Sequence, residues 1–227
     1  MRAAVVVLAA GTGTRVGAEV NKVLLPLAGV PVVARSVRTA RQVAGVDRVV
    51  LVVRDGEQDA VRAAVEPYLG DAGSDVVMAT GGDTRHRSEW AAMSLLAPAI
   101  AGGELDLVLM HDAARPLTST ALYDAVLIAA QRTGGALPVG PLDDLVSVDG
   151  SALPEHLAGV QTPQAFRARD LLAAHRAAAD DGFEATDTAG ILARYADLEV
   201  AAVDSPSANL KLTVAEDFVV AEALMAQ

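Results

Sequence analysis

The segment AVVVLAAGTGTR, residues 4–15, decides how this chain folds. Residues 4–8 are apolar and rich in valine, which is typical of a strand buried on both faces of a sheet. Gly11 and Gly13 follow at once and predict a tight turn at the end of that strand. A buried strand that ends in a glycine-rich turn predicts a parallel sheet with a ligand at its carboxyl edge.

Short β-branched runs alternate with helical patterns along the rest of the chain. We expect further strands at residues 48–53, 76–78, 105–110, 136–139 and 199–203. We expect helices at residues 32–43, 58–65, 88–96, 120–132, 169–179, 188–196 and 215–225. A capping box from Thr213 to Glu216 would open the last helix. The alternation predicts an α/β fold, a Rossmann-like, mostly parallel twisted sheet with helices on both faces.

Residues 141–160 interrupt this alternation. They contain neighbouring aspartates, a proline, and a turn signal at Asp149 and Gly150, with one short strand-like run before that turn. We interpret them as a short β-arm that leaves the main body. No internal repeat or flexible linker is evident, so we expect one domain, residues 1–227, with a β-arm at about 141–160.

Composition argues against several classes of function. The net charge of −11 argues against nucleic acid or an anionic membrane as a partner. The absence of cysteine excludes disulfides, a thiolate nucleophile and cysteine-ligated zinc. The apolar run at residues 3–10 is too short for a membrane span or a signal peptide, and we expect a cytoplasmic protein.

The glycine-rich turn admits four interpretations. A dinucleotide-binding fingerprint would need a third glycine where Val16 stands, and a P-loop would need a Gly-Lys-Ser/Thr sequence that is absent. A purely structural turn remains possible. The fourth interpretation is a nucleotidyltransferase signature, in which two alanines and Gly-x-Gly-x-Arg precede a lysine. Residues 8–15 and Lys22 match that signature, whose backbone N–H groups can surround a triphosphate.

Lysine is rare in this chain. Lys22 and Lys211 are the two lysines among 18 basic residues. A lysine is a compact point charge that suits a single phosphate oxygen, whereas arginine is a planar fork that needs more room. We therefore expect these two lysines to bind phosphate.

Further segments narrow the class. Residues 81–88, 111–116, 161–166, 186–187 and 209–213 follow the glycine-rich turn in order. Together they resemble the 2-C-methyl-D-erythritol 4-phosphate cytidylyltransferase family and its relatives that act on ribitol 5-phosphate. The resemblance covers nearly the whole chain and implies a nucleotidyltransferase fold of the GT-A-like type. It further implies CMP transfer from CTP to a polyol phosphate with release of pyrophosphate, Mg²⁺ as cofactor, a homodimer, and a place in non-mevalonate isoprenoid synthesis.

The resemblance also implies roles for individual residues. The nucleotide would be bound by Ala9, Ala10, Gly11, Gly13, Gly82, Asp83, Ser88 and Asp112. Arg15, Lys22 and Lys211 would be catalytic, with Lys211 at the α-phosphate, and Asp112 would also be the metal ligand. Arg115 and Thr162 would help to shape the acceptor side. We add Asp144 and His156 of the arm as candidate acceptor contacts, with His156 and Arg115 as substitutes for the family's basic residues. From the sequence alone, Asp83 could equally be a helix N-cap and Arg115 the partner of a helix carboxylate.

No general base is expected, because a phosphate monoester with a second pKa near ~6 is already largely dianionic at neutral pH. The acceptor side departs from the family pattern at Asp144, Val146 and Pro154, where the family carries basic or small polar residues. An extra carboxylate at Asp144 is electrostatically unfavourable for a phosphate. Two alternatives therefore stand beside the leading hypothesis. One is a cytidylyltransferase for another polyol or sugar phosphate, and the other is a nucleotide-binding protein without catalysis.

Overall fold

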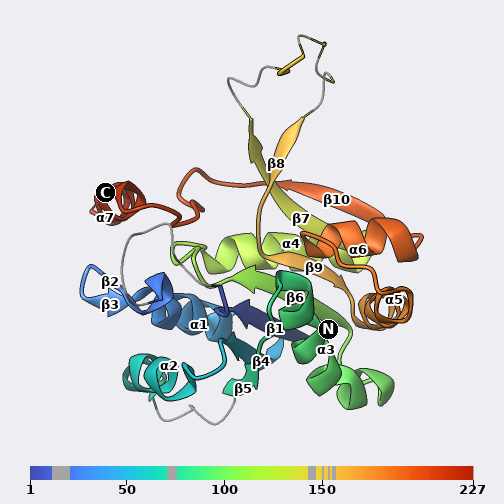
Figure 1. Ribbon diagram of the computed structural model, residues 1–227, viewed down its shortest axis with the longest axis horizontal. Coiled ribbons are helices and arrows are strands. Elements are labelled where there is room, and N and C mark those ends of the chain that lie inside the picture. Colours follow the sequence, from blue (N-terminus) through green and yellow to red (C-terminus); the bar gives the residue numbers. More distant parts are fainter. Residues whose placement is uncertain are drawn as a thin grey trace.

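The structure is a computed structural model of the chain, and it describes residues 1–11, 21–70, 76–142, 147–149, 151–152, 154 and 157–226. Within these residues one large mixed sheet has the strand order β10-β7-β9-β6-β1-β4-β5, with β8 paired to β7 (Figure 1). The strands are β1 (Ala3–Leu8), β4 (Val46–Val53), β5 (Val76–Thr80), β6 (Leu107–Asp112), β7 (Gly134–Pro141), β8 (Ala158–Val160), β9 (Gln164–Arg167) and β10 (Glu199–Asp204). A small antiparallel pair joins β2 (Pro26–Leu27) to β3 (Val30–Pro31).

The central strand β1 is buried on both faces, as its valine-rich sequence predicts. Val5 and Val7 pack into one core, whereas Ala4 and Val6 pack into the other, because successive side chains of a strand point to opposite faces. Strand β1 pairs in parallel with both β4 and β6. It is therefore the centre on which both layers of helices are built.

Helices cover both faces of the sheet. The first core receives α1 (Val32–Gln42), α2 (Gln58–Val65), α4 (Thr120–Thr133) and, at its margin, α7 (Glu216–Met225). The second core receives α3 (Arg85–Ala101), α5 (Ala168–Asp181) and α6 (Thr188–Tyr195). The α/β fold with a mostly parallel, helix-covered sheet is confirmed.

The structure differs from the sequence-based expectation at several elements, because the short strands β2, β3 and β8 were not predicted. Strand β9 was not predicted, and it lies antiparallel between β6 and β7 in the middle of the sheet. The capping box at Thr213 is wrong, because the side chain of Asp217 accepts hydrogen bonds from the backbone N–H groups of Thr213 (2.5 Å) and Val214 (2.9 Å). Helix α7 begins at Glu216. Its N-cap residue is Ala215, which has no side chain that could form a capping hydrogen bond.

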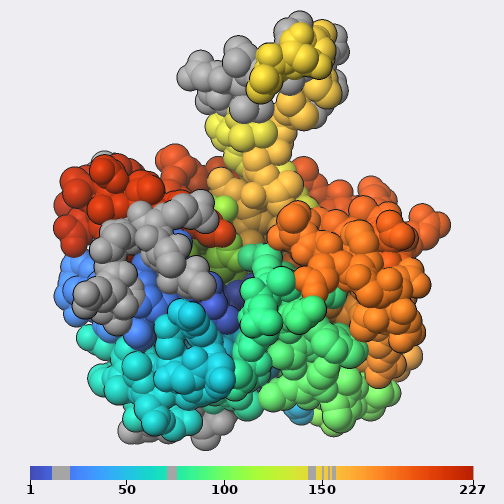
Figure 2. All heavy atoms as spheres, viewed as in Figure 1, coloured from blue at the N-terminus to red at the C-terminus, as the bar shows by residue number. Residues whose placement is uncertain are grey.

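The paired strands β7 and β8 continue outward from the sheet as a narrow ribbon (Figure 1). Figure 2 shows the described residues of this arm, in yellow, standing clear of the rest of the molecule. Leu142, Val148, Leu157 and Val160 on the arm are exposed apolar side chains. Among the helices of the described residues, none is long and apolar enough to cross a membrane.

Candidate active site

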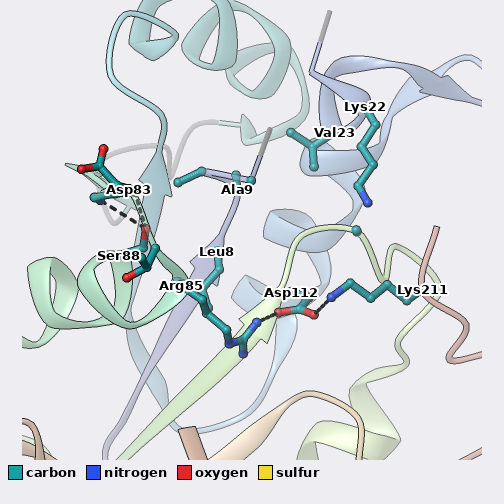
Figure 3. Close-up of a pocket in the computed structure, with 14 residues that line it drawn as sticks. Leu8, Ala9, Lys22, Val23, Asp83, Arg85, Ser88, Asp112 and Lys211 are labelled. Carbon is teal, nitrogen blue, oxygen red and sulfur yellow. Dashed lines mark hydrogen bonds and ion pairs between the residues drawn. The ribbon is translucent and has the colours of Figure 1, made fainter. Parts of the chain in front are cut away.

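A pocket of about 370 Å³ opens at the carboxyl edge of the sheet, beyond the ends of β1 and β6. The parallel register pairs Leu8 with Asp112, so both strands end at the same level. Figure 3 shows side chains from several separate segments pointing toward this space. The described lining residues are Leu8, Ala9, Ala10, Gly11, Lys22, Val23, Gly82, Asp83, Thr84, Arg85, Ser88, Asp112, Ala114 and Lys211.

Asp112, the last residue of β6, lies between two cations on one side of the pocket (Figure 3). Its Oδ2 accepts a hydrogen bond of 2.6 Å from Nζ of Lys211, and its Oδ1 is paired with Nη1 of Arg85. Burial alone would raise the pKa of Asp112, but Arg85 and Lys211 outweigh that effect and hold the pKa well below its usual range. The carboxylate is therefore charged at any pH near neutrality.

Buried hydrogen bonds to Asn209 and Leu212 fix the segment that carries Lys211. Nη1 of Arg115 donates to the backbone oxygen of Asn209 at 2.6 Å, and the N–H of Leu212 donates to the oxygen of Ala114 at 2.8 Å. The side-chain oxygen of Asn209 in turn accepts from the hydroxyl of Thr118 at 2.6 Å. These bonds hold Lys211 beside the end of β6.

Lys22 opens a short 3₁₀ turn, η2 (Lys22–Leu24), and its side chain points into the pocket across from Asp83 and Ser88 (Figure 3). The preceding residue, Asn21, is buried and joins this turn to two neighbours. Its Nδ2 donates to the backbone oxygen of Ala9 (3.2 Å) and to Oε2 of Glu57 (2.7 Å), and its Oδ1 accepts from the N–H of Val23 (3.3 Å). Asn21 therefore sets the distance between Lys22 and the end of β1.

Gly82 lines the pocket, and Gly81 packs directly behind two lining residues. A Cβ atom on Gly81 would lie 2.7 Å from both Cβ of Ala10 and Oγ of Ser88, so a larger residue would displace these two side chains. The hydroxyl of Ser88 accepts from the N–H of Gly82 at 3.2 Å. The N-cap of α3 is Thr84, not Asp83, and the carboxylate of Asp83 is almost fully exposed at the rim. The alternative role of Asp83 as the N-cap of a helix is therefore wrong.

The pocket brings together most of the residues expected to bind the nucleotide. The described residues of that set are Ala9, Ala10, Gly11, Lys22, Gly82, Asp83, Ser88, Asp112 and Lys211, and all of them line it. Gly13, Arg15, Asp144 and His156 lie outside the described residues. Sequence reasoning assigned no role to Arg85, whose contact with Asp112 joins positions 27 residues apart.

Arg115 and Thr162, expected on the acceptor side, are buried behind the pocket and are not among its described lining residues. Arg115 contacts Asn209, as described above. The hydroxyl of Thr162 accepts from the backbone N–H of Asp112 at 3.0 Å and lies 3.2 Å from Nδ1 of His111. Burial lowers the pKa of His111 to about 4, so this histidine is neutral and packed near pH 7.

The described residues hold no cluster of three or more His, Cys, Asp or Glu side chains that could form a metal cage. Asp112 nevertheless offers one carboxylate inside the pocket. Magnesium in proteins is usually bound by one or two carboxylates together with substrate phosphates and water. This donor set fits an ion that enters with a triphosphate.

The pocket at the sheet edge, with Gly82 in its lining and an acid between two cations, has the features expected of a nucleotidyltransferase. The family model described as 2-C-methyl-D-erythritol 4-phosphate cytidylyltransferase matches residues 3–227. The chain therefore belongs to the 2-C-methyl-D-erythritol 4-phosphate cytidylyltransferase family.

Individual relatives agree with this assignment. The enzyme of that name from Cereibacter sphaeroides is 39% identical over 232 residues, which cover 100% of this chain and 98% of the relative. The crystal structure of the Thermus thermophilus enzyme has a TM-score of 0.76 and 31% identity, and both chains are covered completely. The structure of 4-diphosphocytidyl-2C-methyl-D-erythritol synthase from Anaerococcus prevotii has a TM-score of 0.82 at 24% identity and supports the fold.

Proposed function

We propose that this chain transfers the cytidylyl group of CTP to the phosphate of 2-C-methyl-D-erythritol 4-phosphate and releases pyrophosphate. Such a step serves isoprenoid biosynthesis. The observation that carries the proposal is the position of Asp112 between Arg85 and Lys211, inside a pocket that also contains Lys22. Family membership over residues 3–227 supplies the identity of the two substrates.

In this reaction an oxygen of the acceptor phosphate attacks the α-phosphorus of CTP. A new P–O bond forms, and the bond from the α-phosphorus to the bridging oxygen breaks, so that pyrophosphate leaves with the bonding electrons. The side chain of Lys211 is 42% exposed toward the pocket and can therefore reach a bound phosphate. Its charge would stabilise the negative charge that develops on the five-coordinate phosphorus.

The remaining roles follow the arrangement of the pocket. Lys22 would hold the β- and γ-phosphates, and Arg15 stays a predicted contact of the same phosphates. Ala9, Ala10, Gly11 and Gly13 would let the backbone approach the nucleotide closely. Gly82, Asp83 and Ser88 would surround the cytosine, and the exposed carboxylate of Asp83 is a suitable acceptor for the exocyclic amino group. That amino group distinguishes CTP from UTP.

We propose Asp112 as the protein ligand of Mg²⁺. When bound, Mg²⁺ would supply positive charge to the triphosphate oxygens. Asp112 stays charged near neutrality, and its Oδ2 would become available to the metal when Lys211 moves from it to a bound phosphate.

The acceptor side deserves a second candidate, because Asp144, Val146 and Pro154 depart from the family pattern and Pro154 is exposed on the arm. The alternative acceptor is another polyol phosphate, such as ribitol 5-phosphate. Arg115, Thr162, Asp144 and His156 stay predicted acceptor contacts. The test is pyrophosphate release from CTP and Mg²⁺ with a panel of polyol phosphates. Pyrophosphate release with 2-C-methyl-D-erythritol 4-phosphate supports the leading proposal. Pyrophosphate release with a different polyol phosphate alone supports the alternative. No pyrophosphate release with any acceptor contradicts both.

We also propose a single domain that acts as a cytoplasmic homodimer. The exposed apolar side chains of the arm, Leu142, Val148, Leu157 and Val160, support contact with a second copy, because exposed apolar patches mark interaction surfaces. A cytoplasmic location fits the use of CTP, an intracellular nucleotide. Light scattering at several protein concentrations tests the dimer, and a monomer at all of them would contradict it.

A further inference from the structure

Glu89 is a buried carboxylate on α3, directly behind the pocket wall. Only 1% of the residue is exposed, and it follows Arg85 by one helical turn. A carboxylate removed from water in this way is costly unless charges and hydrogen bonds compensate it. Glu89 does not line the pocket. The groups that neutralise its buried charge therefore indicate how it acts on the residues that do line the pocket.

Two groups converge on Oε1 of Glu89. Nε of Arg85 lies 2.9 Å away, and the hydroxyl of Thr188, at the start of α6, donates at 2.8 Å. The other oxygen, Oε2, lies 3.7 Å from Nε2 of His175 on α5. Burial lowers the pKa of His175 to about 3, so this ring carries no charge near neutrality. Arg85 is therefore the cation that compensates Glu89.

Arg85 thus contacts two carboxylates with one guanidinium group. Its Nε forms an ion pair with Oε1 of Glu89 without hydrogen-bond geometry, and its Nη1 is paired with Oδ1 of Asp112. An arginine that has no second carboxylate beside its Nε can turn its fork and bind a single carboxylate through two parallel contacts. On Asp112, that arrangement would compete with Lys211 for the carboxylate. The contact with Glu89 restrains Arg85 to one of the oxygens of Asp112 and leaves the other for Lys211.

We propose that Glu89 is a positioning residue for nucleotidyl transfer, which holds Arg85 in the orientation that keeps Asp112 shared between Arg85 and Lys211. The hydroxyl of Thr188 fixes Glu89 in turn, so that α6, α3, β6 and the Lys211 segment are joined by one line of contacts. This role rests on the proposed function, because its consequence is the alignment of the reacting phosphate.

The main test is steady-state kinetics of Glu89→Gln above pH 8, where the carboxylate of the wild type is ionised, because this change keeps the size of the side chain and removes its charge. We expect kcat to fall tenfold to a hundredfold, on the order of losses seen when residues that orient metal-site ligands are changed. The KM for the acceptor should stay unchanged, because Glu89 contacts only the Arg85 side of the site. The kcat of Arg85→Lys should fall by a similar factor. The kcat of the double variant should be no lower than that of Arg85→Lys alone, because both changes remove the same interaction between Glu89 and Arg85. Fully additive losses would overturn the proposal.

Two further variants separate positioning from stability. Ile100→Val removes one buried methylene from the same helix and the same core, eleven residues beyond Glu89, and we expect wild-type kinetics. Thr188→Val removes only the hydroxyl that fixes Glu89 and should lower kcat in the same direction, but less. If Glu89→Gln does not fold, wild-type kcat in Thr188→Val would still overturn the proposal.

A calorimetric titration with CTP alone keeps this inference distinct from the proposed function. Without acceptor, the Arg85 and Glu89 variants should show the same non-additive pattern in CTP affinity. A wild-type protein that binds CTP but never releases pyrophosphate would contradict the proposed function, and the binding cycle would still test Glu89. Wild-type kcat and CTP affinity in Glu89→Gln would overturn the positioning role and leave the function standing.

Discussion

Nζ of Lys211 lies 2.6 Å from Oδ2 of Asp112, although 99 positions separate the two residues in the chain. The contact joins the carboxyl end of β6 to the segment that follows β10. Because Lys211 remains 42% exposed, it can move from this carboxylate to a phosphate without unfolding its surroundings. The pair therefore presents a cation at the place where the proposed reaction develops negative charge.

The first prediction concerns Asn21, which joins the Lys22 turn to the end of β1. Asn21→Ala leaves the oxygen of Ala9 and the N–H of Val23 without their partner. We expect the free energy of unfolding to fall by about 1–3 kcal/mol, the usual cost of buried polar groups left unpaired. The KM for CTP should rise about tenfold, equivalent to ~1.4 kcal/mol of lost binding, because Lys22 is no longer held at the rim.

A matched control for Asn21 is Ser119→Ala, which removes the capping bond from Ser119 to the N–H of Leu122 at the start of α4. This change should cost about 1 kcal/mol of stability and leave the KM for CTP unaltered. An equal rise in KM for both variants would show that lost stability alone, and not the position of Lys22, explains the effect.

The second prediction distinguishes two roles for Arg115. Its bond to the oxygen of Asn209 indicates that Arg115 braces the Lys211 segment, whereas the family resemblance implies contact with the acceptor. For Arg115→Met we expect a loss of about 2 kcal/mol in unfolding free energy and a lower kcat, with the acceptor KM unchanged. Kinetics at varied acceptor concentration decide the matter. A raised acceptor KM at normal stability would favour direct contact.

The third prediction concerns pH and stability. Burial raises the pKa of Glu89 from 4.5 to about 7, although Arg85 and Thr188 act in the opposite direction. Between those pH values the folded chain keeps a proton that the unfolded chain has released, so the unfolding free energy falls as pH rises. This group alone should therefore remove about 3 kcal/mol of stability between pH 4.5 and 7.

Glu89→Gln lacks that titration. Urea unfolding at a series of pH values should show a variant equal to the wild type near pH 4.5 and more stable than it above pH 7. A difference in stability that does not change with pH would contradict the raised pKa. If Glu89→Gln has a higher unfolding free energy and a lower kcat than the wild type, the buried charge of Glu89 serves function at a cost in stability.

Much of the fold could be predicted from the sequence, because the parallel strands and their helices carry clear periodic patterns. Strand β1 and helix α2 illustrate this, since valine-rich and amphipathic runs depend on local residues alone. Strand β9 escaped prediction because it is only four residues long and directly follows the turn-like pair Thr162 and Pro163. Its strand conformation comes from pairing with β6 and β7, which no local pattern records.

The sequence predicted the site residues that belong to a recognisable motif. It did not predict the residues whose roles depend on contacts with distant parts of the chain. Lys22, Asp112 and Lys211 belong to recognisable segments, and the structure brings them to one pocket. Arg85 and Glu89 have no local signal, because their roles depend on Asp112 from β6 and Thr188 from α6. The glutamate following Ser88 in the sequence resembles any helical surface residue until α5 and α6 cover it.

The most direct test of the central claim is pyrophosphate release from CTP and 2-C-methyl-D-erythritol 4-phosphate by Lys211→Ala, compared with the wild type. We predict that the wild type is active and that the variant loses about 10²–10³-fold in kcat, the range for removing one group that stabilises transition-state charge. Thermal unfolding should show that the variant keeps its fold. Pyrophosphate release by a folded Lys211→Ala variant at a rate near that of the wild type would contradict the account.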